Sequence, residues 1–236
     1  MPPTPGNTGR IGINYLPEKG SNTFLFQPKD LVQLETAWDW QRKRREMLMR
    51  EPLSPQAVWL LEHHSCYTIG RGSNQANVLF DTSQSSSRLH QIDRGGDVTH
   101  HLEGQLVAYL VIDLHRYKTD LSWYLRELEQ VLIDLLNILD LPGERLNGLT
   151  GVWCKGLKVA SIGVGCRRWI TQHGLALNVN CDLAGFKEIL PCGLNASKIG
   201  KLDFWIPDIT VKDVNPLLEK CLCEHFGFTW IKESNS

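Results

Sequence analysis

Residues 151–179 read GVWCKGLKVASIGVGCRRWITQHGLALNV. This stretch is rich in Val, Ile and Trp, and its side chains alternate between apolar and polar, which is typical of β-strands. Lys155-Gly156 fits a tight turn between two strands, because glycine readily adopts the backbone conformation that such turns need. The stretch therefore predicts two or three antiparallel strands between residues 150 and 180.

Further strands are predicted on the N-terminal side of this stretch. The apolar run AVWLLEHHSCY, residues 57–67, indicates one buried strand. The polar segment SQSSSRL, residues 83–89, predicts a loop that leads into another. Residues 106–114 are apolar nearly throughout, so we expect a strand there that is covered on both faces.

Helices are predicted where apolar residues recur at helical spacing. They are expected over residues 30–50, ended by Pro52 and Pro55; over the leucine stripe 121–139, capped by Thr119 or Asp120 and ended by Pro142-Gly143; over a short segment 182–189; and over residues 213–226. Helices mixed with strands in this way predict an α/β protein with a mixed β-sheet flanked by helices.

The length of 236 residues suits one large domain or two small ones, and 42% apolar residues are enough for a packed core. We expect a single catalytic domain over residues 13–230, with flexible tails at 1–12 and 231–236. A subdivision near residue 150 stays open.

Several classes of protein are disfavoured by composition. The 25 basic and 26 acidic residues nearly balance, whereas a nucleic-acid binder usually has a basic excess. The longest apolar stretch, residues 106–114, contains Asp113 and is far shorter than the roughly 20 residues of a membrane span. The first ten residues lack the apolar core of a secretion signal. Seven cysteines without a CxxC pair favour reduced thiols. We therefore expect a cytoplasmic protein that binds neither nucleic acid nor membrane.

Three glycine-bearing segments carry polar residues without an evident structural task. In the first, residues 94–101, the pair Gly95-Gly96 allows backbone N–H groups to approach a ligand, although such pairs also form ordinary turns. In the second, Lys158 lies within an apolar strand and either points to solvent or serves a cleft. In the third, Cys192 lies between Pro191 and Gly193 and is either presented to a cleft or an inert core residue.

Cys192 and Lys158 together suggest a mechanism. A free thiol has a pKa of about 8.5, so it is mostly protonated at neutral pH, and only the thiolate is a good nucleophile. A nearby ammonium group favours the thiolate by charge attraction. The two residues are 34 positions apart, so only the fold can bring them together.

Two other clusters contain residue types that are found in binding sites. His63-His64, Cys66, His100-His101 and Cys221-x-Cys223 are of metal-ligand type, but their spacing matches no recognised zinc site, and no metal is expected. Four consecutive basic residues, 42–45, form a solvated helical face or a docking patch for an acidic partner protein.

Five motifs, in order over roughly residues 30–210, resemble those of the lipoyl(octanoyl) transferase family. They are VWLLEH (58–63) with YTIGRG (67–72), RGGDVTHH (94–101) with GQLVAYLVIDL (104–114), GLKVASIG (156–163), HGLALNVN (173–180) and PCG (191–193). The resemblance implies the fold of biotinyl and lipoyl protein ligases.

The resemblance also implies the activity, the first step of endogenous protein lipoylation. An octanoyl group would pass from the phosphopantetheine of acyl carrier protein to a lysine of lipoyl domains, through a thioester on Cys192. The acceptors would be the lipoyl domains of 2-oxoacid dehydrogenase complexes and the glycine cleavage H protein. Lys158 would lower the pKa of Cys192, and no cofactor is implied, because the incoming thioester is already activated.

The same resemblance assigns the acyl pocket to fourteen residues: Arg94, Gly95, Gly96, Asp97, Val98, Thr99, His100, His101, Ser161, Ile162, Gly163, Gly174, Leu175 and Ala176. Backbone N–H groups near Gly193 or Gly163 are candidates for stabilising the oxyanion. The chain departs from the family pattern at Leu102-Glu103, where Gly-Pro is usual, and at Ala196-Ser197, where a threonine is common.

Four alternatives remain open. A lipoate-activating ligase shares the fold but makes an acyl-adenylate. An amidotransferase between lipoyl domains also uses a cysteine. A Cys–His thioesterase, with His101 or His173 as the base, releases free acid. A non-catalytic module would bind acyl-proteins without turnover.

Overall fold

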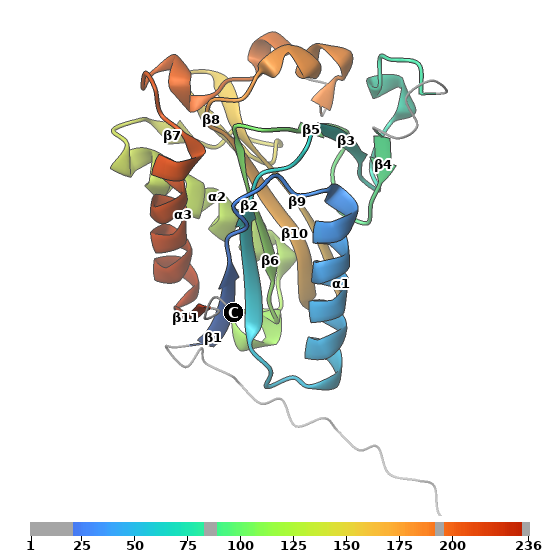
Figure 1. Cartoon of the computed structure of the whole chain (residues 1–236), viewed down its shortest axis with the longest axis vertical. Helices are drawn as coiled ribbons and strands as arrows, with labels where there is room; N and C mark the ends of the chain where they lie inside the picture. Colours follow the sequence, from blue (N-terminus) through green and yellow to red (C-terminus); the bar gives the residue numbers. More distant parts are fainter. Residues whose placement is uncertain (1–20, 83–88, 192–195, 233–236) are drawn as a thin grey trace, which may run out of the picture.

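A large mixed β-sheet forms the centre of the molecule (Figure 1). The structure is a computed structural model, and it describes residues 21–82, 89–191 and 196–232. Within these ranges eight strands follow the order β11-β1-β2-β6-β10-β9-β8-β7. Their bounds are β1 Ser21–Phe26, β2 Gln56–Leu61, β6 Gln105–Val111, β7 Gly143–Glu144, β8 Val152–Cys154, β9 Leu157–Arg167, β10 Ile170–Asn178 and β11 Phe228–Lys232. A small second sheet, β4-β3-β5, comprises Leu89–Gln91, Cys66–Ile69 and Thr99–His101.

The pairing directions confirm a mixed sheet. Strand β1 runs parallel to both β2 and β11, whereas β6 pairs antiparallel with β2 and β10. Because β6 precedes residue 150 and β10 follows it, the sheet continues across the boundary that the sequence left open. The predicted hairpin is also confirmed: β8 and β9 are joined at Lys155 (φ 48°) and Gly156 (φ 80°).

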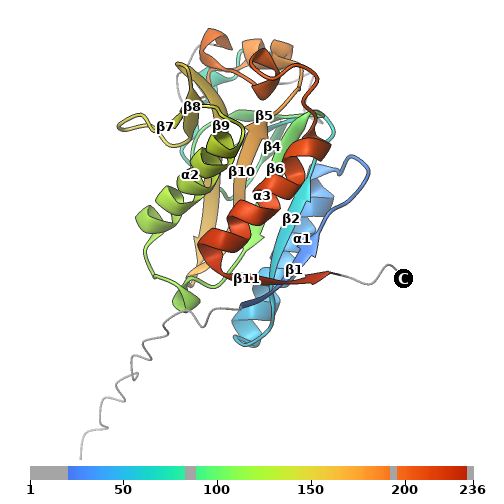
Figure 2. The same cartoon turned by 90° about the vertical axis from the view of Figure 1, so that its left-hand side faces the viewer.

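Helices cover both faces of the sheet (Figures 1 and 2). Helix α1, Leu34–Arg50, packs on β10 and β6 from one side. Helices α2, Leu121–Ile138, and α3, Val211–Phe226, cover the opposite face. Strand β6 lies between these layers, and all seven of its residues are buried, as its continuous apolar sequence predicts.

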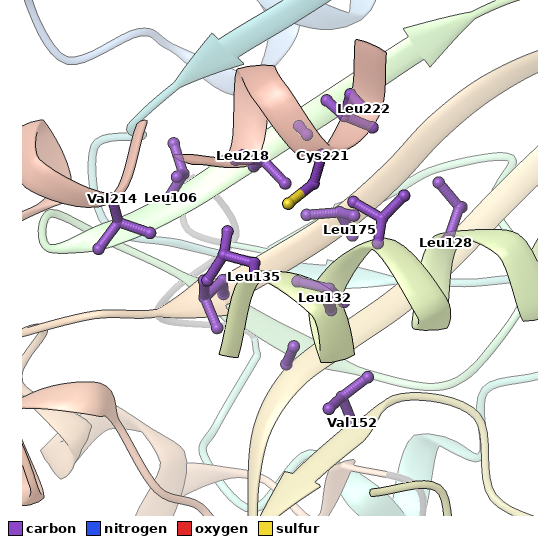
Figure 3. Close-up of a cluster of buried hydrophobic side chains, with 14 of the residues drawn as sticks. Leu106, Leu128, Leu132, Leu135, Val152, Leu175, Val214, Leu218, Cys221 and Leu222 are labelled. Atoms are coloured by element: carbon purple, nitrogen blue, oxygen red, sulfur yellow. The ribbon is translucent and has the colours of Figure 1, made fainter. Parts of the chain in front are cut away.

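The predicted apolar stripes of α2 and α3 meet over the sheet (Figure 3). Leu128, Leu132 and Leu135 of α2 are fully buried against Leu218 and Leu222 of α3. Removing one such leucine side chain typically costs about 2–5 kcal/mol, because both the burial and the packing are lost. This interface therefore contributes much of the stability that holds the sheet in place.

Side-chain caps define the starts of both helices. The Asp120 carboxylate accepts the N–H of Trp123 at 3.0 Å, so of the two predicted caps for α2 the structure has Asp120. Thr210 and Asp213 form a reciprocal capping box at the start of α3. Gly227 ends α3 in the left-handed conformation, with φ 63°.

We expect Asp120→Ala to lower the free energy of unfolding by about 1 kcal/mol, because it removes a helix N-cap. Urea denaturation followed by circular dichroism measures this change. Thr119→Ala is the matched control, since Thr119 is exposed and is not the cap. Equal losses in the two variants would contradict the assignment of the cap to Asp120.

The expected single strand over residues 57–67 is wrong. Strand β2 ends at Leu61, and β3 begins at Cys66 in the second sheet. The physical reason lies at His63, whose ring is held by Val32 O and the Tyr109 hydroxyl, so the chain leaves the large sheet there. The short segment near 182–189 is a 3-10 helix, Leu183–Glu188.

Strand β11 continues to Lys232, two residues beyond the expected domain end at 230. The expected N-terminal tail 1–12 and the polar segment 83–88 lie outside the described residues, as do residues 233–236.

None of the helices in the described part of the chain has the length and apolar character needed to cross a bilayer.

Candidate active site

A cavity of about 430 Å³ lies along the edge of β9. Strand β8 pairs only with the first residues of β9, up to Ala160. Beyond Ala160, the same edge of β9 is bordered by segments other than β8. The volume falls within the range of about 300–1,000 Å³ that is usual for small-molecule sites. Thirteen of the fourteen residues predicted for the acyl pocket line it: Arg94, Gly95, Gly96, Asp97, Val98, Thr99, His101, Ser161, Ile162, Gly163, Gly174, Leu175 and Ala176.

His100 is the exception. Strand β5 is extended, so successive side chains point to opposite sides. Thr99 and His101 line the cavity, whereas the His100 ring stacks on Tyr67, with ring centres 4.3 Å apart. His100 Nε2 also lies 2.9 Å from the Ser65 hydroxyl. His100 therefore supports the small sheet from behind the cavity wall.

Glycines allow the segment 94–96 to lie directly on β9. The Gly95 N–H donates to Val164 O at 2.8 Å. A Cβ atom on Gly163 would lie 3.0 Å from Gly95 O and from the Arg94 side chain, which is tighter than ordinary contact. The Arg94 guanidinium donates to both Thr68 O and Thr68 Oγ1 at 2.8 Å. Arg94 thus clamps this wall of the cavity to β3.

Lys158 is buried in the cavity wall, with 4% of its surface exposed. It lies opposite Trp153 in the β8–β9 pair, and its ammonium group is 5.2 Å from the centre of the Trp153 ring. The solvent-facing alternative that strand alternation allowed is therefore wrong. Lys158 therefore faces the cavity rather than solvent.

Cys192 lies outside the described residues, so its distance to Lys158 is a prediction. Its neighbour Pro191 lines the same cavity as Lys158. Upstream, the Leu190 N–H donates to Asn77 O at 2.8 Å, and the Asn77 side chain donates to the Asp97 carboxylate. Downstream, the Gly200 N–H donates to the backbone oxygen of Lys158 at 2.9 Å. The described chain on both sides is thus tied to the cavity wall.

His101 has a fixed tautomer at the cavity. The Gln105 side chain donates to Asn178 Oδ1 at 2.8 Å, so its own oxygen accepts from His101 Nδ1, also at 2.8 Å. Burial lowers the pKa of His101 well below its ordinary value, so the ring is neutral. Its Nε2 is therefore the unprotonated nitrogen, able to accept a proton or a hydrogen bond.

His173 forms another polar part of the wall. Burial lowers its pKa, and the neutral ring donates from Nε2 to the Asp93 carboxylate at 2.9 Å. This hydrogen bond is the largest of the effects that hold the pKa of Asp93 down to about 2. Trp38 and Arg45 also donate to Asp93, at 3.2 and 3.3 Å.

The basic run 42–45 is divided by this arrangement. Arg45 turns inward, with 12% of its side chain exposed, and also bonds to the Gln172 side chain. Arg42 and Lys43 are largely exposed and pair with Asp39. The sequence therefore missed one role of this run, since Arg45 supports Asp93 beside the cavity.

Several residues that line the cavity were not predicted to do so. They are Ile92, Tyr109, Leu121, Leu125, Gly148, Leu149, Thr150, Val164 and His173. Lys158, and Pro191 beside the predicted nucleophile Cys192, complete the lining. Leu121 and Leu125 belong to the apolar stripe of α2 and gave the same signal as core residues. The sequence offered His173 only as an alternative base for a thioesterase, and it directly precedes the predicted Gly174.

Lowering the pH is expected to weaken the fold through His63. This ring is fully buried, donates from Nδ1 to Val32 O and accepts the Tyr109 hydroxyl at Nε2, 2.7 and 2.8 Å away. Burial lowers its pKa to about 4. Between pH 6.5 and 4 the unfolded chain therefore binds a proton that the folded protein does not, and stability falls with pH by on the order of 3 kcal/mol.

Urea titrations at several pH values between 7 and 4 measure this loss. His101 and His173 act in the same direction, so the His63 contribution is the difference between the parent protein and His63→Gln. The variant is expected to lose stability less steeply below pH 6.5. Identical slopes for the two proteins would contradict the prediction.

Comparison with known proteins identifies the family. Residues 34–223 match the family described as lipoyl protein ligase A/B catalytic domain. A protein of Prochlorococcus marinus named octanoyltransferase is 59% identical over 219 residues, which cover 93% of this chain and 98% of the relative. The chain belongs to the octanoyltransferase family. It is therefore an enzyme, an acyltransferase, as the motifs predicted.

Solved structures confirm the fold expected for an octanoyltransferase. A crystal structure of lipoate-protein ligase A bound with ATP matches with a TM-score of 0.72 at 14% identity, over 92% of this chain and 90% of the other. Biotin protein ligase from Aquifex aeolicus, in complex with biotin and ATP, matches with a TM-score of 0.52 at 14% identity, over 86% and 70%. At such identities the likeness concerns the biotinyl and lipoyl protein ligase fold alone.

The described cysteines of this octanoyltransferase-family chain are poor nucleophiles. None of the six lines the cavity. Burial raises the pKa of each thiol: to about 12 for Cys66 and Cys181, to about 11 for Cys221, and in the same direction for Cys154, Cys166 and Cys223.

The described residues do not gather three His, Cys, Asp or Glu side chains into a metal site.

Proposed function

We propose that this enzyme transfers an octanoyl group from octanoyl-acyl carrier protein to a lysine of lipoyl domains, through a thioester on Cys192. The observation that carries the proposal is the buried Lys158 in a cavity that Pro191, the neighbour of Cys192, also lines. Cys192 directly follows Pro191 in the sequence, and consecutive Cα atoms are about 3.8 Å apart, so we place its thiol at this cavity, beside that ammonium. The raised pKa values of the six other cysteines leave Cys192 as the candidate thiolate.

The first half-reaction acylates the enzyme. The Cys192 thiolate attacks the carbonyl carbon of the octanoyl thioester, a new C–S bond forms, and the C–S bond to the carrier's phosphopantetheine breaks. The departing thiolate takes a proton from the Lys158 ammonium, which becomes a neutral amine. One thioester replaces another, so this step is nearly balanced in free energy.

The second half-reaction delivers the acyl group. The amine of the acceptor lysine attacks the Cys192 thioester, a C–N bond forms, and the C–S bond breaks. The proton lost by the attacking amine passes to the neutral Lys158, which restores the thiolate–ammonium pair. An amide is more stable than a thioester, so this step runs downhill. Such a two-step transfer gives ping-pong kinetics.

Apolar side chains suit the cavity to an alkyl chain. Ile162 and Leu175 of the sheet, Leu121 and Leu125 of α2, and Leu149 form its apolar wall. Each buried methylene contributes roughly 0.8 kcal/mol, so every carbon that the wall covers strengthens binding about fourfold. The acceptors fitting this chemistry are lipoyl domains of 2-oxoacid dehydrogenase complexes and the glycine cleavage H protein, whose modification is the first step of protein lipoylation.

A thiol-specific adduct tests the proposal. After mixing with octanoyl-acyl carrier protein, intact-mass analysis is expected to reveal one octanoyl group on the parent protein and none on Cys192→Ser. Cys166→Ser is the matched control: Cys166 lies on β9, as Lys158 does, but does not line the cavity. An adduct that persists in Cys192→Ser would refute the nucleophile.

The fate of the adduct separates the remaining alternatives. Adding an unmodified lipoyl domain is expected to discharge the adduct and to octanoylate one lysine. Release of free octanoic acid instead would indicate a thioesterase with His101 as the base for water. Acylation by an octanoylated lipoyl domain, but not by the carrier protein, would indicate an amidotransferase.

A further inference from the structure

A buried carboxylate lies on the helix that borders the cavity. Glu129 of α2 has no exposed surface, although a buried charge is costly unless it is well paired. Its Oε2 accepts from Arg126 Nη1 at 2.7 Å and from Arg145 Nε at 2.9 Å. Its Oε1 accepts the backbone N–H of Gly151 at 3.2 Å. The two arginines need only Oε2, so Oε1 is directed at the loop that precedes β8.

Gly151 has a conformation and a position that favour glycine. Its φ is 135°, which L side chains rarely adopt. A Cβ atom there would lie 2.6 Å from Ala160 O and 2.7 Å from Lys158 Cε. The backbone of Gly151 is therefore in the space beside the end of the Lys158 side chain.

Lys158 is thus held between two surfaces. Gly151 contacts the end of its alkyl chain, and the Trp153 ring lies 5.2 Å from the ammonium nitrogen. A lysine side chain has several rotatable bonds and loses up to about 2 kcal/mol of conformational entropy when fixed, so its direction depends on such surfaces. The loop that supplies Gly151 also supplies three residues of the cavity wall, 148–150.

Arg145 joins the same loop to α2. Besides Glu129, it donates to the backbone oxygen of Arg126 at 3.0 Å and to the Gln130 side chain at 2.8 Å. The Arg126 guanidinium, in contrast, comes from α2 itself and pairs with Glu129, and it is the backbone oxygen of Arg126, not its side chain, that accepts from Arg145. Glu129 therefore contacts the loop at both ends: it shares Arg145 with Arg126 O and Gln130, and it also accepts the Gly151 N–H.

We propose that Glu129 is a positioning residue for acyl transfer: through the Gly151 N–H it holds the surface that directs Lys158 into the cavity. The catalytic consequence of this inference rests on the proposed function, whereas the placement of Lys158 rests on geometry alone. Without the carboxylate, the loop loses its anchor at Gly151, and the end of the Lys158 alkyl chain loses the surface that it contacts.

Glu129→Leu, with Arg126→Met as the matched control, tests the inference. The first readout does not involve acyl transfer: the rate of Lys158 acetylation by acetic anhydride, followed by peptide mass spectrometry between pH 7 and 10. We expect the rate profile of Lys158 to change at least threefold in Glu129→Leu and to stay within error in Arg126→Met. Gly151→Ala, which leaves Glu129 in place, is expected to produce the same kind of change.

The second readout is steady-state octanoyl transfer, corrected for the folded fraction. Glu129→Leu is expected to lower kcat at least tenfold while KM for the octanoyl carrier changes less than twofold. Glu129→Gln, which keeps an oxygen for the Gly151 N–H, is expected to recover most of kcat. A purely structural ion pair predicts instead that activity follows thermal stability in all variants.

Two outcomes would overturn the inference: unchanged Lys158 acetylation in folded Glu129→Leu, or an equal change in Arg126→Met. Should Glu129→Leu fail to fold, Glu129→Gln and Gly151→Ala decide the question by the acetylation readout. Failure of the proposed function is recognised separately, because octanoyl transfer would then survive in Lys158→Met whatever the acetylation profiles are.

Discussion

Lys158→Met is expected to slow octanoyl transfer by about 10²–10³-fold at pH 7. A thiol with a pKa of about 8.5 is only some 3% ionised at pH 7, so losing the ammonium removes up to about 30-fold of the thiolate. Proton transfer to the leaving thiolate and from the acceptor amine is lost as well, and such transfers contribute about 10²-fold or more. Methionine keeps the length of the side chain, so the cavity wall is largely preserved.

The pH profile separates the two losses. Single-turnover acylation is expected to recover toward pH 9, where the thiol ionises unaided, whereas the part due to proton transfer persists. Lys155→Met is the matched control: it lies on the same hairpin but is exposed and does not line the cavity. A loss that is the same at every pH would indicate that Lys158 positions the substrate rather than ionising the thiol.

Gly174→Ala is expected to lower the free energy of unfolding by at least about 4 kcal/mol. Gly174 lies in β10 opposite Tyr109, and an added Cβ atom would be 2.2 Å from Ala108 O, a backbone atom of the central strand β6. Side-chain rotation cannot relieve such a contact. Two fully buried strands, β6 and β10, would have to separate, and the cavity wall that Gly174 and Leu175 form would move with them.

Differential scanning calorimetry measures this effect. For a chain of this size each kcal/mol shifts Tm by about 2–4 °C, so a decrease of about 8–16 °C is expected. Gly72→Ala is the matched control, because its Cβ would make ordinary van der Waals contact at 3.5 Å from Gly96 O. A Tm of Gly174→Ala within two degrees of the control would refute the prediction.

Much of the fold follows from local sequence signals. The leucine stripe of α2, its Asp120 cap and the Lys155-Gly156 turn each depend on residues within a few positions of one another. The strand over residues 57–67 was wrong because its apolar pattern continues through the segment at which the chain changes sheets. That change depends on His63 meeting Val32 and Tyr109, which are distant in the sequence.

The candidate site likewise combines features that local motifs predict with features that depend on residues distant in the sequence. Motifs located most of the cavity wall, but alternation within β5 sends His100 behind it, and no motif reports that direction. Leu121 and Leu125 give the same helical signal whether they face the core or a cavity. The burial of Lys158 depends on Gly151 and Trp153, which lie on the other side of a hairpin. Local alternation of apolar and polar residues therefore could not tell whether Lys158 is buried or exposed.

The pairing of β1 with β11 has a consequence for synthesis. These strands lie side by side at one edge of the large sheet, yet β11 is translated after all the other strands. A nascent chain on the ribosome therefore carries β1 with one row of backbone groups open until translation has passed residue 232. Unpaired strand edges invite association with other chains, so truncation within β11 would leave a template for aggregation even where the cavity is complete.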